Sequence, residues 1–213
     1  MSFTLGVYEL FAYIVPGILY LYVVNEFLKL FTLSYIEFKN FDNIAATVLF
    51  ILFSYILGQL FDFIADKWRR WRQPKEGNLD SIERLKRHHP KSNVNFLPQD
   101  SAFLLSLIRR DYPDVATTAD RSKALSKMLQ NISLGLLFYT LFQLASFVLT
   151  GFSIGHLLIA LLALIFGLLA KRRSQRYNRW YYDHIYETAL TYGSDTDKII
   201  KKIQSDRQKK KIN

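Results

Sequence analysis

The sequence contains no cysteine, which removes disulfide bonds, thiolate zinc sites and cysteine nucleophiles from the chemistry open to it. It also has no phosphate-binding glycine loop, no HExxH string and no serine nucleophile elbow. Charged residues are nearly absent from four windows, whereas a soluble helical bundle would carry lysine and glutamate along one face of every helix. These absences predict a membrane protein with neither a metal site nor a cofactor.

Each of the four windows is long enough to cross a bilayer core of about 30 Å as a helix. The sequence therefore predicts an all-α integral membrane protein with four transmembrane helices and a small helical cytoplasmic region. The expected parts, in chain order, are a transmembrane hairpin over residues 1–66 (spans 7–30 and 44–64), a cytoplasmic helical segment over 67–130, a second transmembrane hairpin over 131–170 (spans 132–149 and 152–170) and a cytoplasmic basic helical tail over 171–213.

Three short helices are expected in the polar segment between the hairpins. Asp80 and Glu83 have the spacing of a capping box, which predicts a helix from Asp80 to about His88. A second helix is expected over residues 99–110, where apolar residues recur on one face. A third is expected to begin near Ala116 and to continue without a break into the third span.

Lysine and arginine are concentrated on one side of the predicted membrane. Residues 65–130 carry 14 of them and residues 171–213 carry 12, and the two others are Lys29 and Lys39. Because loops rich in these residues stay in the cytoplasm, both termini are predicted to be cytoplasmic. The net charge of +10 is thus explained first by the topology, which collects basic residues on the cytoplasmic side. Anionic lipid headgroups are the expected partner of these residues. RNA is a second candidate partner, since a basic surface also attracts phosphate backbones.

Basic and aromatic residues alternate where the second span ends and again after the fourth. Indole rings favour the depth of the lipid headgroups, and the neighbouring cations can contact anionic lipid. The residues assigned to this interface are Trp68, Arg69, Arg70, Trp71, Arg72, Arg172, Arg173 and Trp180.

Pro16 and Gly17 fall in the middle of the first span. Proline removes a backbone hydrogen bond and glycine admits a second backbone, so the pair predicts a kinked helix packed against a neighbour. Polar groups in hydrocarbon usually face the bundle interior, and those within or at the edges of the spans are candidates for lining a conduit or binding a partner helix. The alternative is that the ionisable ones are interfacial side chains. The candidates are Glu9, Gln59, Asp62 and Gln143.

Two strings, Arg84 to His89 and Arg179 to His184, share the spacing R-x4-H. This spacing resembles that of the metal-independent HEPN ribonucleases, in which arginine and histidine meet across a dimer to act on the RNA 2′-hydroxyl. The resemblance implies these four residues as catalytic candidates. A polar residue normally follows the arginine in that family, and an apolar one stands there in both strings. The alternative is a solvated basic helix in one case and an interface helix in the other.

The opening Glu9-Leu-Phe-Ala-Tyr-Ile-Val-Pro-Gly17, together with Ser54-Tyr-Ile-Leu-Gly58-Gln59 and a basic exit from the second span, resembles small bacterial multi-pass membrane proteins of anti-phage defence loci. These include the membrane accessory proteins beside the RNA-guided RNA nucleases of type VI-B CRISPR systems. The resemblance covers residues 1–60. It implies a defence-associated membrane effector or modulator and carries over no catalytic residue.

The leading hypothesis is a non-enzymatic inner-membrane protein that forms homo-oligomers and perturbs or permeabilises the membrane on a cytoplasmic trigger, such as a soluble defence protein. Two alternatives belong to other classes. One is a membrane-tethered ribonuclease or RNA-binding regulator that uses the R-x4-H strings. The other is a membrane scaffold that recruits a soluble partner.

Overall fold

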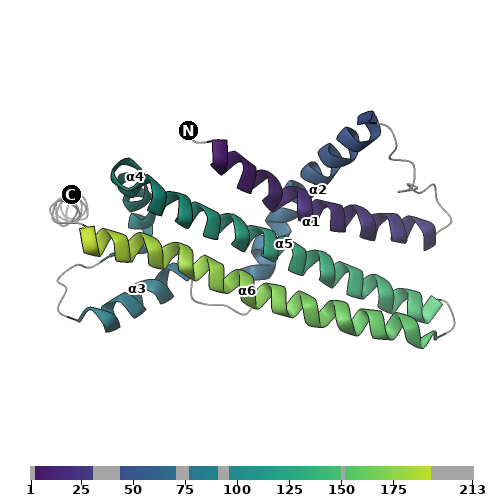
Figure 1. Ribbon diagram of the computed structural model, residues 1–213. Helices are drawn as coiled ribbons and strands as arrows, with labels where there is room; N and C mark the ends of the chain where they lie inside the picture. The colour runs from purple at the N-terminus through teal and green to yellow at the C-terminus, as the bar shows by residue number, and fades with distance from the viewer. Residues whose placement is uncertain (1–2, 31–43, 71–76, 91–95, 150–151, 193–213) are drawn as a thin grey trace, which may run out of the picture. The chain divides into compact units, whose positions relative to one another are not determined.

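The computed structural model describes residues 3–30, 44–70, 77–90, 96–149 and 152–192, and these residues form helices and no strands (Figure 1). The expected all-α class is confirmed. Contacts divide the chain into two compact units, a membrane unit (Met1–Pro74 and Lys123–Tyr177) and a polar unit (Lys75–Ser122 and Asn178–Asn213). The elements are α1 (Phe3–Leu30), α2 (Ile44–Arg70), α3 (Gly77–His88), the 3-10 helix η2 (Pro98–Asp100), α4 (Ser101–Asp111), α5 (Pro113–Leu149) and α6 (Ile154–Tyr192).

Four of these helices are long and apolar enough to span a membrane, as the four apolar windows predict. At 37 and 39 residues, α5 and α6 extend about 55–60 Å, roughly twice the thickness of a bilayer core. Each therefore continues well beyond its span, and the unbroken helix expected from Ala116 into the third span is confirmed. It begins three residues earlier, at Pro113, because proline is well accommodated in the first turn of a helix.

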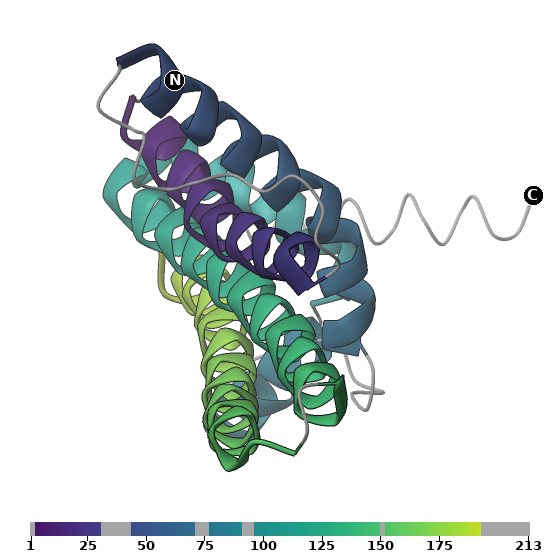
Figure 2. The ribbon, with the colours of Figure 1, turned by 90° about the vertical axis from the view of Figure 1, so that its right-hand side faces the viewer.

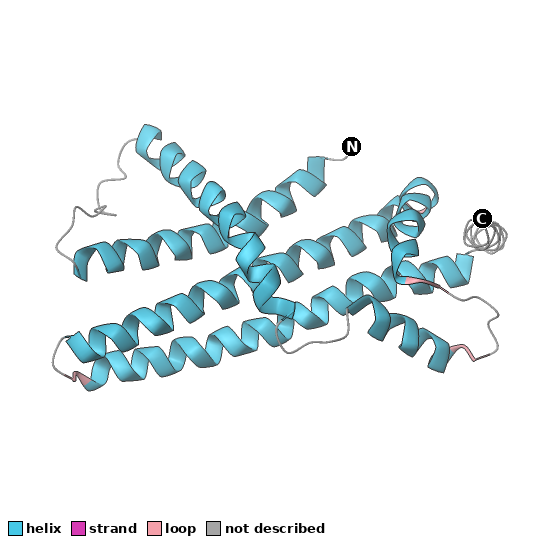
Figure 3. Ribbon diagram, turned by 180° about the vertical axis from the view of Figure 1, so that it is seen from behind, coloured by secondary structure: helices cyan, strands magenta, loops and turns pink. Residues whose placement is uncertain are grey.

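In the membrane unit, α1 and α2 cross with their backbones in close contact (Figure 3). Gly17 faces the main chain of Ser54, and Gly58 faces the main chain of Tyr13, so a Cβ at either glycine would overlap the opposing backbone. Pro16 lies inside α1 without ending it, and the ribbon of α1 bends near its middle (Figures 1 and 3). The kink and the close helix contact expected at this position are both present.

In the second hairpin α5 and α6 run side by side (Figures 1 and 2). Small polar side chains join the two helices. Ser126 Oγ donates to the backbone oxygen of Ser174 at 2.9 Å, and Ser174 Oγ donates to that of Ser126 at 2.8 Å. Further along the hairpin, Gln143 is buried, and its Oε1 lies 2.7 Å from Nδ1 of His156. Small hydroxyl side chains let two membrane helices approach closely and still meet their hydrogen-bonding needs.

The polar unit has its own apolar core around Tyr186. This ring is fully buried and lies 5.2 Å from the ring of Phe96, between centroids. Its hydroxyl donates to Oδ1 of Asn78, whose amide nitrogen donates in turn to the backbone oxygen of Pro98 at 2.6 Å. The core consists of Ile82, Leu85, Phe96, Leu104, Ile108, Ala116, Ala119, Ile185, Tyr186 and Ala189.

The expected capping box at Asp80 and Glu83 is wrong. α3 begins at Gly77, so Asp80 lies within the helix, in its first turn, and is not the N-cap residue. Asn78 is buried and forms hydrogen bonds with Tyr186 and Pro98, and it belongs to the helix. α3 therefore begins nearer the N-terminus than the spacing of Asp80 and Glu83 indicates. The carboxylate of Asp80 is used instead for ion pairs with two arginines.

Candidate functional site

Asp62 of α2 forms the centre of a polar cluster in the membrane unit. Asn131 of α5 donates from Nδ2 to Asp62 Oδ1 at 3.1 Å, and Lys127 Nζ lies 3.9 Å from Asp62 Oδ2. Lys127 and Asn131 are four residues apart, so one face of α5 presents both groups to α2. The two charges can neutralise each other, which lowers the cost of keeping either in a membrane helix.

Two tyrosines of α1 extend this cluster to a third helix. Tyr20 is fully buried, and its hydroxyl donates to the backbone oxygen of Asn131 at 2.8 Å. Lys127 Nζ donates to the hydroxyl oxygen of Tyr13 at 3.1 Å. The cluster therefore joins α1, α2 and α5 through polar contacts as well as through apolar packing.

From Tyr13 a ring contact and then a hydrogen bond lead on to the outer surface of α2. The rings of Tyr13 and Tyr55 meet edge to face with centroids 5.9 Å apart. Gln59 Nε2 donates to the hydroxyl oxygen of Tyr55 at 2.7 Å, and the Gln59 side chain is exposed. We call Tyr13, Tyr20, Tyr55, Gln59, Asp62, Lys127 and Asn131 the polar chain.

One acceptor in the polar chain is left without a donor. Asn131 is fully buried, and its Oδ1 has no hydrogen-bond partner among the residues that the structure describes. A buried polar atom of this kind costs free energy, because it has lost its water and gained no partner. The cluster is therefore able to accept one more donor, such as a water molecule or a shifted Lys127 ammonium.

The other predicted intramembrane residues lie elsewhere. Gln143 pairs with His156 between α5 and α6 and makes no described contact with the polar chain. Glu9 belongs to α1, and its side chain lies outside the described part of the structure. Of the four candidates, the structure thus joins Gln59 and Asp62 in one chain of contacts.

The structure describes some of the residues predicted to lie at the lipid interface. The Lys171 ammonium lies over the Trp68 ring, 3.8 Å from the ring centroid. Trp68 Nε1 donates a hydrogen bond to Ser133 Oγ at 3.2 Å. Arg172 is exposed, and the Arg173 guanidinium lies over the Tyr177 ring at 4.9 Å. Trp180 is half-buried, while the side chains of Arg69 and Arg70 and all of Trp71 and Arg72 lie outside the described residues.

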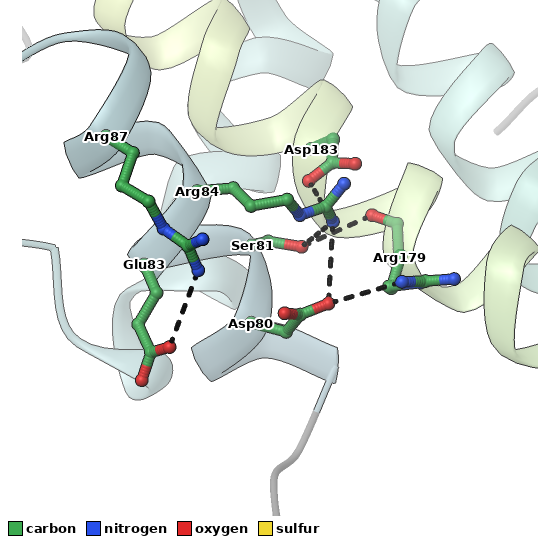
Figure 4. A network of polar contacts seen from close by, with 7 residues as sticks. All are labelled: Asp80, Ser81, Glu83, Arg84, Arg87, Arg179 and Asp183. Carbon is green, nitrogen blue, oxygen red and sulfur yellow. Dashed lines mark hydrogen bonds and ion pairs between the residues drawn. The ribbon is translucent and has the colours of Figure 1, made fainter.

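The two arginines of the R-x4-H strings meet in the polar unit (Figure 4). Arg84 Nη2 lies 3.1 Å from Asp183 Oδ1 and 3.8 Å from Asp80 Oδ2, and Arg179 Nη1 lies 3.6 Å from the same Asp80 oxygen. Two carboxylates therefore share two guanidinium groups, and Ser81 Oγ lies 3.5 Å from the Arg179 backbone oxygen. This network ties α3 to α6 and balances its own charge.

The two histidines do not join that network. His89 is exposed just beyond α3, and His184 is half-buried on α6. Within the described residues, neither imidazole forms a hydrogen bond or ion pair with Arg84 or Arg179. Acid–base catalysis requires side chains within hydrogen-bond reach of the reacting group and of each other, so the arrangement in one copy favours a structural role for both arginines.

Comparison with models of protein families, with curated proteins and with solved structures found no match to this chain. Candidate roles for its residues therefore follow from their contacts. Sequence patterns indicated Gln59 and Asp62 but missed their partners. Lys127 and Asn131 precede the apolar part of α5, in a stretch where polar residues are common and do not stand out. Their four-residue spacing does show that they lie on the same face of the helix.

Proposed function

We propose that this chain is a membrane effector or accessory protein of bacterial anti-phage defence that assembles with copies of itself and perturbs the bilayer when a cytoplasmic partner binds the polar unit. The resemblance of residues 1–60 to membrane proteins of defence loci supports this setting. The proposed action is mechanical and requires no catalytic residue.

The proposal puts the polar unit and both termini in the cytoplasm and the spans in the inner membrane. The positive-inside rule supports this orientation, because 26 of the 28 lysine and arginine residues fall on one side of the predicted spans. The Lys171 ammonium over the Trp68 ring supports a position of both residues at headgroup depth, where tryptophan is enriched.

The observation that carries the proposal is the polar contact of Asp62 with Lys127 and Asn131. Ionisable residues retained in membrane helices commonly mark ion pathways, proton relays or voltage-sensing elements. α5 supplies residues up to Ser122 to the polar unit and residues from Lys123 onward to the membrane unit, without a break in the helix. A partner that shifts α5 would move Lys127 away from Asp62, and water would then follow the carboxylate into the cytoplasmic end of the second span.

Membrane potential during infection tests this proposal. Cells carrying the chain with its genomic neighbours are infected with phage and followed with a potentiometric dye. We expect depolarisation that depends on the chain, and depolarisation even without phage in Lys127→Met, because this change leaves Asp62 unpaired. Lys86→Met removes an equal charge from an exposed position of α3 and is the matched control. Protection from phage without any depolarisation would contradict the effector proposal.

Two further measurements separate the alternatives. A scaffold predicts a stoichiometric soluble partner after purification in detergent, whereas an effector of the proposed kind predicts a self-oligomer. A ribonuclease predicts that His89→Ala with His184→Ala abolishes protection while leaving expression unchanged. Under our proposal this double variant keeps the depolarisation response.

A further inference from the structure

The outer face of α2 carries an uncharged polar group among apolar side chains. Gln59 is exposed in the middle of the apolar stretch Ile44–Trp68, and only 11 % of that helix's apolar window is buried. Its Nε2 donates to Tyr55, and in the described part of the chain its Oε1 accepts no hydrogen bond. A carboxamide has two donor hydrogens and one acceptor oxygen, so most of its hydrogen-bonding capacity is unused.

This face points away from the rest of the membrane unit. Successive helical residues are about 100° apart, which puts Ser54, Gly58 and Ala65 together on the buried side of α2. Gln59 lies about 120° from the middle of that side, and Leu52, Ile56 and Phe63 lie about 140–180° from it. These three apolar side chains are 51 %, 49 % and 66 % exposed, and Gln59 is exposed beside them.

Lipid tails provide no hydrogen bonds, so an exposed carboxamide at this depth requires a polar partner. A second copy of the same chain supplies one, because a carboxamide is both donor and acceptor and two of them can pair with each other. Such pairing arises when two copies are related by a twofold axis, which brings identical residues face to face. Glutamine side chains are known to join membrane helices in this way.

We propose that α2 forms a homotypic contact with α2 of a second copy, centred on Gln59 and flanked by Leu52, Ile56 and Phe63. This contact rests on the self-assembly in the proposed function and identifies the surface that mediates it. It also places Gln59 at the end of a chain of contacts that runs through Tyr55 and Tyr13 to Lys127. The assembly surface and the charge pair are thus connected within each copy.

Disulfide trapping in native membranes tests the contact, and the chain has no cysteine of its own to interfere. A disulfide requires Cα atoms within about 7 Å, so Ile56→Cys, which leaves Gln59 intact, is expected to give covalent dimers under mild oxidation. Ile64→Cys is the control, because Ile64 is 42 % exposed but lies about 140° around the helix from Gln59. Equal crosslinking at 56 and 64, or none at 56, would overturn the proposal.

A second series tests whether the carboxamide causes the contact. Ile56→Cys reports on the same face while Gln59 is intact, and adding Gln59→Leu is expected to lower its crosslinking about tenfold through loss of the paired amides. Unchanged crosslinking would refute a role for Gln59. Labelling of Ile56→Cys by a membrane-impermeant thiol reagent, in place of crosslinking, would show a water-lined surface and also refute the contact.

These results are independent of the membrane-potential assay. Depolarisation without crosslinking at residue 56 would refute the α2 contact and leave the proposed function standing. Crosslinking at residue 56 without depolarisation would support the contact and contradict the proposed function.

Discussion

Substituting the glycines at the crossing of α1 and α2 provides a direct test of the fold. In Gly17→Ala the new Cβ would overlap the backbone of Ser54, and in Gly58→Ala it would overlap the backbone of Tyr13. A backbone cannot rotate away as a side chain can, so the two helices must separate. Overpacking of this kind costs about 3 kcal/mol, and alanine returns about 1 kcal/mol of helix propensity. We therefore expect each variant to lose about 2 kcal/mol of stability.

Two other glycines provide matched controls for the same substitution. A Cβ at Gly155 would meet Ser153 Oγ at 3.7 Å, and one at Gly167 would meet Leu136 Cβ at 3.4 Å, both ordinary contacts. Alanine at these positions is expected to leave stability unchanged or to raise it by up to about 1 kcal/mol. Reversible unfolding in mixed detergent micelles measures all four variants. Equal effects at Gly17 and Gly155 would refute the close backbone contact.

Two ion pairs give further predictions that the same unfolding measurement checks. Asp62→Asn removes the carboxylate beside Lys127 and is expected to cost about 1–3 kcal/mol, a range that allows for solvent screening of the half-exposed lysine. Adding Lys127→Met should recover part of this loss, and strictly additive effects would contradict a direct interaction. In the polar unit, Arg84→Met and Asp183→Asn should couple by about 0.5–1 kcal/mol, and no coupling would mean that their 3.1 Å pair is absent in solution.

The spans could be predicted because hydropathy is a property of a continuous run of residues. The windows predict the apolar stretch of each long helix, and two of the helices continue beyond it. α2 runs on from Ile64, the expected end of the second span, to Arg70, and α6 runs on from Ala170 to Tyr192, as the helical tail expected after the fourth span predicts. Hydropathy reports where a helix leaves the hydrocarbon, whereas the helix itself ends where its backbone hydrogen bonds end.

The site was predictable only in part. Gln59 and Asp62 were identifiable because each is polar within an apolar run, and Gly17 because glycine beside proline indicates a close helix contact. Their partners depend on tertiary packing. Lys127 and Asn131 lie in a polar stretch of sequence, and nothing in the local pattern shows that this face of α5 meets α2.

Asp80 shows why a local pattern can mislead. Its spacing from Glu83 satisfies a capping box, yet α3 starts earlier, at Gly77. The carboxylate instead lies near Arg84, one turn further along α3, and Arg179, which comes from a distant part of the chain. Long-range ion pairs of this kind leave no trace in a window of four residues.

The pairing of α2 with α5 also has a consequence for the biosynthesis of the chain. Asn131 follows Asp62 by 69 residues, so at ordinary translation rates on the order of ten seconds separate the synthesis of the two. The backbone contacts of the α1–α2 crossing lie within these two helices and can form in that interval. Until α5 is made, however, the second helix carries the Asp62 carboxylate without Asn131 and Lys127 beside it. Because an acid without partners is costly in a membrane helix, the first hairpin reaches its most stable state only after α5 arrives.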